Sequence, residues 1–218
     1  FCIMLSGMTD ILFDGPNGAP LSLILAHGAG ARMDSPFMAA FAAGLGARGI
    51  RTARFEFPYM AIRRVTGKKR PPDRQPILLQ TWRRVIAQVI VQVGGRPLAI
   101  GGKSMGGRMA TLLAAEAEAP EIAALVCLSY PFHPAGKPDH PRTDHLAELA
   151  PPSLMVQGER DALGNRADVA GYELPDNMQF HWCPDGDHNL TPRKRSGHAQ
   201  AGNWRGAMDA IAEFLGSI

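Results

Sequence analysis

The sequence contains few cysteines, only three in 218 residues, and no long apolar run. Cys2, Cys127 and Cys183 are too widely spaced for a disulfide scaffold or a CxxC zinc site, so we expect a reducing compartment, the cytoplasm. Apolar runs such as 21–26 are far shorter than the roughly 20 residues that cross a bilayer, which argues against a membrane-spanning protein. The apolar start, 1–5, lacks the basic residues of a signal peptide, so we expect none.

An excess of one charge is also missing. The formal net charge is +3 and 20% of the residues are charged, which does not favour a nucleic-acid-binding protein. The hydrophobic fraction of 45% and the length predict one globular domain, 1–218. Basic residues gather between Arg63 and Arg74, opposed there only by Asp73. We expect a solvated loop, and a rim that attracts anionic substrates is the alternative.

Apolar segments of strand length alternate with segments of helical spacing. The expected strands are 21–27, 50–57, 97–102, 122–129, 153–157 and 178–183. The expected helices are 35–47, 77–93, 105–119 and 203–215. This alternation predicts an α/β fold with a mainly parallel sheet and helices on both faces. Functional groups in such sheets lie beyond the carboxyl ends of the strands.

One strand end carries a candidate nucleophile. Between the strand 97–102 and the following helix stands Gly102-Lys103-Ser104-Met105-Gly106, which fits the G-x-S-x-G nucleophile elbow. Glycines two residues on either side allow a sharp turn that exposes the Ser104 hydroxyl. The same stretch contains Gly-Lys-Ser of a P-loop, but Pro97 stands where that motif needs its first glycine. We therefore favour a nucleophile over a nucleotide site.

A serine nucleophile needs a base and an acid that orients the base. Asp161 follows the strand 153–157, and His188 follows the strand 178–183, which gives the chain order serine, acid, histidine. Glu159 competes with Asp161 for the role of the acid. Asp185 and Asp187 could orient His188 only locally, and we favour the separate loop.

Two backbone N–H groups would stabilise an oxyanion. One candidate is Met105, the residue after the nucleophile. The other follows the first strand, where Ala29 is favoured and Gly28 is second. A dinucleotide motif fails here, because Met33 stands where G-x-G-x-x-G needs its last glycine.

The other histidines point to no metal or cofactor. His133, His140 and His145 fall in a proline-rich connection without a carboxylate or cysteine at a matching interval. His181 and His198 are expected to be structural.

Four segments resemble the dienelactone-hydrolase-like subgroup of the α/β-hydrolases, small predicted hydrolases that include a testis-expressed animal protein and part of a nonspecific-lethal chromatin-complex subunit. The segments are 27–38, 102–108, 130–138, and 186–188 together with 192–194. The resemblance covers roughly 20–216. It implies one α/β-hydrolase domain, a Ser-Asp-His site and no cofactor. True dienelactone hydrolases use a cysteine nucleophile, and position 104 here is serine.

These observations predict a serine hydrolase that cleaves a carboxylic ester, or a thioester, through an acyl-enzyme. The expected partner is a small molecule, with no nucleic acid and no membrane. The segment 130–152 is too short for a lid domain, so we expect a shallow, open site with little or no lid. The alternative is a noncatalytic interaction module with the same fold.

Overall fold

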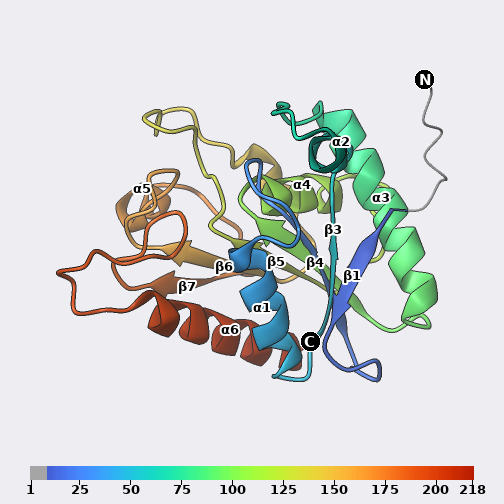
Figure 1. Ribbon diagram of the computed structural model, residues 1–218. Coiled ribbons are helices and arrows are strands. Elements are labelled where there is room, and N and C mark those ends of the chain that lie inside the picture. Colours follow the sequence, from blue (N-terminus) through green and yellow to red (C-terminus); the bar gives the residue numbers. More distant parts are fainter. Residues whose placement is uncertain (1–8) are drawn as a thin grey trace.

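Seven strands form one sheet in the computed structural model, which describes residues 9–218 (Figure 1). The apolar start, 1–5, and Cys2 lie outside the described residues. The strands are β1 (Ile11–Asp14), β2 (Ser22–Ala26), β3 (Arg51–Phe55), β4 (Leu98–Lys103), β5 (Ala124–Leu128), β6 (Ser153–Gly158) and β7 (Met178–Cys183). Their order is β1-β3-β2-β4-β5-β6-β7; β2 to β7 are parallel, and β1 pairs antiparallel with β3. The predicted mainly parallel sheet is confirmed.

Helices cover both faces of this sheet, as the sequence predicted. They are α1 (Pro36–Gly46), α2 (Pro58–Thr66), α3 (Gln75–Gln92), α4 (Met105–Ala114), η1 (Asp144–Glu148, a 3-10 helix), α5 (Arg166–Ala170) and α6 (Gln200–Gly216). Within residues 9–218, none of these helices has the length and apolar character needed to cross a membrane.

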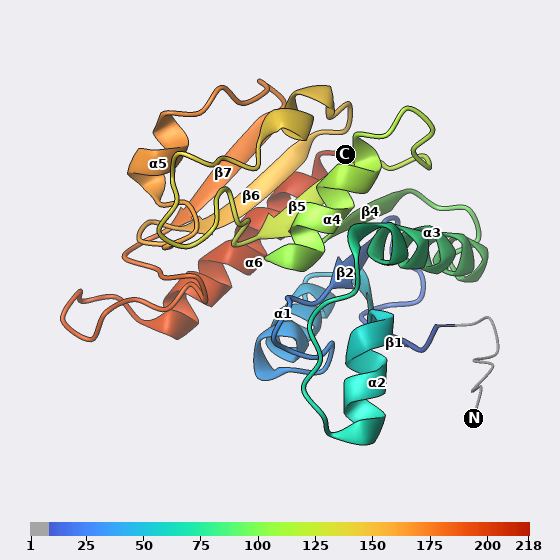
Figure 2. The same cartoon turned by 90° about the horizontal axis from the view of Figure 1, so that it is seen from above.

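The two faces of the sheet have separate apolar cores. Leu23 and Leu25 of β2 point to the core under α1 and α6, whereas Ile24 and Ala26 point to the core under α3 and α4. This alternation follows from the two-residue period of a strand. Figure 2 shows α4 and α6 on opposite faces of the central strands. Because both faces of the parallel strands are buried, polar groups reach solvent at the strand ends.

Several elements differ from the sequence-based expectation. The edge strand β1 was missed, because four residues in antiparallel pairing leave no long apolar run. The helix α2 was also missed, although Pro58 begins it and Gly67, whose φ is 68°, caps its C-terminal end. Arg63 and Arg64 therefore lie on a helix, and the prediction of a loop over 63–74 is wrong for its first part.

The helix expected over 105–119 ends at Ala114. The following turns are tighter, because Glu116 N–H donates to the Leu113 carbonyl oxygen and Ala119 N–H to the Glu116 carbonyl oxygen. Pro120 disfavours helical geometry at Ala119, and these turns lead the chain back to β5.

Trp82 offers a test of the core between α3 and the sheet. Its side chain is fully buried, and its ring meets the edge of Phe55 at 4.9 Å between centroids. We expect Trp82→Ala to lower the free energy of unfolding by about 3–5 kcal/mol, because it leaves a cavity. The exposed neighbour substitution Arg84→Ala should change it by less than about 0.5 kcal/mol. Urea unfolding measures both, and equal effects would contradict this packing.

Candidate active site

Ser104 occupies a strained turn between β4 and α4. Its φ is 51° and its ψ is −116°, a backbone conformation that residues other than glycine rarely adopt. Its N–H donates to the Leu128 carbonyl oxygen at 2.8 Å, which ties the turn to the end of β5. The hydroxyl is thereby held beyond the carboxyl edge of the sheet.

Two glycines make this turn possible. A Cβ at Gly106 would lie 2.5 Å from the Ala26 carbonyl oxygen, and a Cβ at Gly102 would lie closer still. Gly102 also has a φ of 152°. The structural requirement behind the predicted G-x-S-x-G spacing is therefore a close approach of the turn to the end of β2.

The structure brings Ser104, His188 and Asp161 together from three strand ends. His188 Nε2 lies 2.9 Å from Ser104 Oγ, and His188 Nδ1 lies 2.8 Å from Asp161 Oδ2. Asp161 is fully buried, and it also accepts bonds from Leu163 N–H and from the Gln157 amide at 2.9 and 3.0 Å. Because the carboxylate accepts, Nδ1 carries the proton and leaves Nε2 to accept from the Ser104 hydroxyl.

The competing carboxylates lie elsewhere. Glu159 accepts from Asp185 N–H at 3.0 Å and makes no hydrogen bond to His188 among the described residues. The side chain of Asp185 pairs with Arg193 and Arg160, and hydrogen bonds from Arg193 lower the pKa of Asp185 to about 2. Asp187 accepts from backbone N–H groups of its own loop. These three side chains shape the loop that carries His188.

The predicted oxyanion loop packs against the elbow. A Cβ at Gly28 would lie 3.7 Å from the Ser104 Cβ, and Ala29 is exposed to solvent. Met105 is the first residue of α4, so its N–H has no acceptor within the helix. Gly28 and Met105 therefore lie beside Ser104, and Ala29 follows Gly28 in the chain.

His27 begins this loop, and its side chain, for which the sequence suggested no separate task, fixes the orientation of the loop. It is fully buried; its Nε2 accepts from Phe57 N–H at 3.2 Å, so its Nδ1 donates to the Gly28 carbonyl oxygen at 2.7 Å. Burial lowers the pKa of His27 and keeps the ring neutral. Since C=O and N–H of a trans peptide point in opposite directions, the Ala29 N–H points away from the ring. The Tyr59 hydroxyl donates to the Ala29 carbonyl oxygen at 3.0 Å.

Lys103 is a second residue whose role the sequence did not reveal. Only 8% of its surface is exposed, and its ammonium donates to the His188 carbonyl oxygen. The ammonium also lies 5.4 Å from the centre of the Phe37 ring. Burial lowers the pKa of Lys103 to about 8, although the charge of Asp161 acts in the opposite direction. Lys103 therefore links the elbow to the histidine loop.

Two of the other histidines make local contacts. His133 Nε2 lies 3.2 Å from Asp168, and His145 Nε2 lies 2.9 Å from the Thr111 hydroxyl. Among residues 9–218, no three histidine, cysteine or acidic side chains gather in a way that could hold a metal ion.

Comparisons with known proteins agree on one fold. Residues 19–216 match the sequence model of a family described as alpha/beta hydrolase domain. A serine hydrolase without lid from Xanthomonas campestris is 24% identical, covers 94% of this chain and 88% of its own, and has a TM-score of 0.68. Est1E from Butyrivibrio proteoclasticus is 18% identical, with 95% and 93% covered and a TM-score of 0.68. Dienelactone hydrolase from Anabaena variabilis is 20% identical, with 95% and 88% covered and a TM-score of 0.67.

Lys103→Met tests the buried ammonium. Because the pKa of Lys103 falls from 10.5 to about 8 on folding, only the unfolded chain keeps this proton between those pH values, and stability rises with pH there. Relative to Lys103→Met, the wild type should gain about 3 kcal/mol of unfolding free energy between about pH 7 and about pH 10.5. Guanidinium titrations at both pH values measure this gain. Lys69→Met, at an exposed lysine, should give no such gain, and parallel pH curves for wild type and Lys103→Met would contradict the buried charge.

Proposed function

The chain belongs to the alpha/beta hydrolase domain family, and we propose that it is a serine hydrolase that cleaves a carboxylic ester through an acyl-enzyme. The observation that carries the proposal is the continuous set of contacts from Asp161 through His188 to Ser104 at a strained elbow. The narrower likeness to the testis-expressed subgroup stays a prediction.

In the first step Ser104 Oγ attacks the ester carbonyl carbon, and the hydroxyl proton passes to His188 Nε2. The 2.9 Å contact between Oγ and Nε2 suits this transfer. Asp161 holds the ring by its Nδ1 proton and stabilises the imidazolium that forms. His188 then gives the proton to the leaving alcohol, and water hydrolyses the acyl-enzyme by the same route in reverse.

The carbonyl oxygen gains negative charge in both steps. The N–H groups of Met105 and Ala29 are the proposed donors to it, with Gly28 as the second candidate in the loop. Each donor would lower the barrier by about 3 kcal/mol. The His27 and Tyr59 contacts support this assignment, because they hold the loop in one orientation before substrate binds.

A noncatalytic interaction module is the competing function. Such a module would not need the buried Asp161 carboxylate to orient His188, nor His188 to contact the Ser104 hydroxyl at the elbow. The complete set of contacts therefore favours an enzyme, and an ester is the first substrate class to test.

Ser104→Ala is the direct test of the nucleophile. We expect it to lower kcat/KM for p-nitrophenyl butyrate at least about a thousandfold, because the acyl-enzyme cannot form. The melting temperature should not fall, since alanine fits the same turn. Turnover at the wild-type rate in a pure sample would contradict the assignment.

A matched pair of substitutions tests the acid. Asp161→Asn should lower kcat on the order of a thousandfold or more, because the ring loses its orienting carboxylate. Glu159→Gln changes a carboxylate two residues away in the same loop and should lower kcat less than about tenfold. Steady-state kinetics on the same ester measures both, and the reverse ranking would identify Glu159 as the acid.

A further inference from the structure

Gln157, near the end of β6, meets the acid of the site. Its side chain is fully buried and lies four residues before Asp161. The amide nitrogen lies 3.0 Å from Asp161 Oδ2, 3.0 Å from the Gly164 carbonyl oxygen and 3.2 Å from the Tyr130 carbonyl oxygen. These acceptors belong to the loop after β6 and to the segment after β5. One side chain therefore connects two segments beside the site.

The contacts allow the amide of Gln157 only one orientation. All three neighbours of its nitrogen are oxygens that accept hydrogen bonds and cannot donate them. Turning the amide over would bring Oε1 against these oxygens. Oε1 itself is buried and has no hydrogen-bond partner among residues 9–218, which costs stability. The bonds that the nitrogen donates must outweigh this cost, so they decide how the side chain lies.

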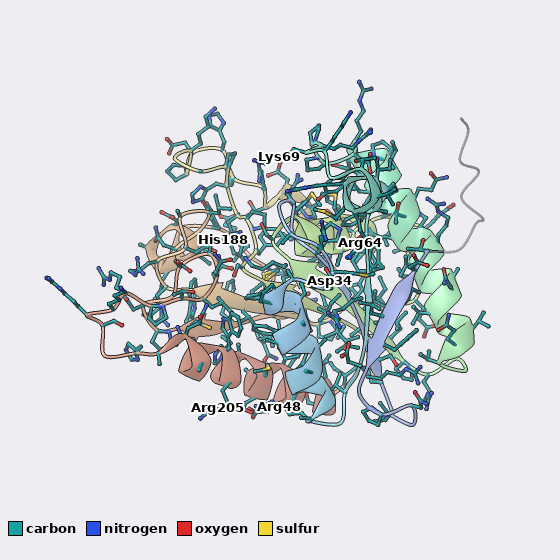
Figure 3. All side chains as sticks on the ribbon, viewed as in Figure 1. Asp34, Arg48, Arg64, Lys69, His188 and Arg205 are labelled. Carbon is teal, nitrogen blue, oxygen red and sulfur yellow. The ribbon has the colours of Figure 1, made fainter. Side chains whose placement is uncertain are left out.

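The carboxylate of Asp161 is held by three donors. His188, labelled in Figure 3, lies in the loop after β7, and its Nδ1 is 3.0 and 2.8 Å from the two carboxylate oxygens. Leu163 N–H donates to Oδ1, but Leu163 belongs to the same turn as Asp161 and would move with it. Gln157 instead stands on β6, which pairs with β5 on one side and with β7 on the other. Of the three donors, Gln157 is therefore the one that fixes the carboxylate relative to the sheet.

We propose that Gln157 is a positioning residue, which holds the Asp161 carboxylate against the Nδ1 proton of His188. The ring is thereby kept with Nε2 toward the Ser104 hydroxyl, where proton transfer needs it. Among residues 9–218, no hydrogen bond joins Gln157 to Ser104, so Gln157 acts through Asp161. The inference rests on the proposed serine hydrolase function and adds a residue to its machinery.

Gln157→Glu tests this role most sharply, because it keeps the shape of the side chain and replaces its donor by a titratable oxygen. Two carboxyl groups about 3 Å apart cannot both be ionised, so the pair keeps one proton. That proton bridges the two groups in place of the amide N–H. When the pH rises and the proton leaves, two negative charges repel each other and displace Asp161. We expect kcat for p-nitrophenyl butyrate, divided by that of the wild type at the same pH, to fall about tenfold or more between about pH 6 and about pH 9.

Two ionisable groups besides the new carboxyl group act on Asp161. They are His188, which is bonded to it, and Lys103, whose charge interacts with that of Asp161. Both groups are present in the wild type and in the variant, so dividing by the wild-type kcat removes their own titration. The other contacts of the substituted side chain, at Tyr130 and Gly164, are carbonyl oxygens, which do not titrate.

Gln157→Met removes the donor without adding a titratable group. It should lower kcat about tenfold to a hundredfold at both pH values, because the carboxylate loses its tie to the sheet. KM should change less than about threefold, since acylation and deacylation both use His188 and slow together. Gln179→Glu is the matched control, because it makes the same change at an exposed position of the neighbouring strand β7. It should leave kcat within about twofold of the wild type at both pH values.

Melting curves at both pH values show which variants are folded, and should Gln157→Met fail to fold, the pH dependence of Gln157→Glu decides alone. A kcat within about twofold of the wild type in the folded Gln157 variants, or a loss in Gln157→Glu that does not change with pH, overturns the positioning role while ester hydrolysis at Ser104 stands. Unfolding of Gln157→Glu already at about pH 6 overturns it too, because the shared proton should preserve the contact. Absence of ester hydrolysis by the wild type, together with an unreactive Ser104, overturns the proposed function and this inference with it.

Discussion

The turn at residues 102–106 passes so close to the Ala26 carbonyl oxygen that neither Gly102 nor Gly106 can carry a side chain. This constraint places Ser104 in a conformation that costs about 1–3 kcal/mol and persists only where the surroundings enforce it. The enforcement comes from β4, which lies between β2 and β5 and is buried along its whole length. The rest of the site is arranged around the hydroxyl that this turn presents.

The groups around Ser104 come from distant parts of the chain, and buried polar contacts connect them. His188 reaches Ser104 from the loop after β7, and Asp161 reaches His188 from the loop after β6. Lys103 bonds the His188 carbonyl oxygen, so the elbow and the histidine loop are joined twice. His27 Nδ1 donates to the Gly28 carbonyl oxygen and so fixes the peptide bond before Ala29, in the loop after β2. Such contacts orient the reacting atoms before substrate arrives.

Much of this arrangement could be predicted from the sequence, because its main features are local. Six parallel strands follow from apolar runs, and the elbow follows from a glycine spacing that a close approach requires. The choice between Asp161 and Glu159 could not be predicted, because it depends on which side chain the loop after β6 buries beside His188. Lys103 resembles a surface residue in sequence, and only packing against the histidine loop shows that it is buried. The edge strand β1 and the helix α2 could not be predicted either, because they are short and depend on tertiary contacts that leave no clear pattern in the sequence.

The proposed function requires that Ser104 is an activated nucleophile. A fluorophosphonate probe, followed by mass spectrometry of the labelled peptide, tests it most directly, because this reagent reacts with activated serines and needs no knowledge of the substrate. We expect one adduct, on Ser104, that is lost when His188 is replaced by alanine. Absence of an adduct on well-folded protein, or labelling that survives in His188→Ala, would contradict it.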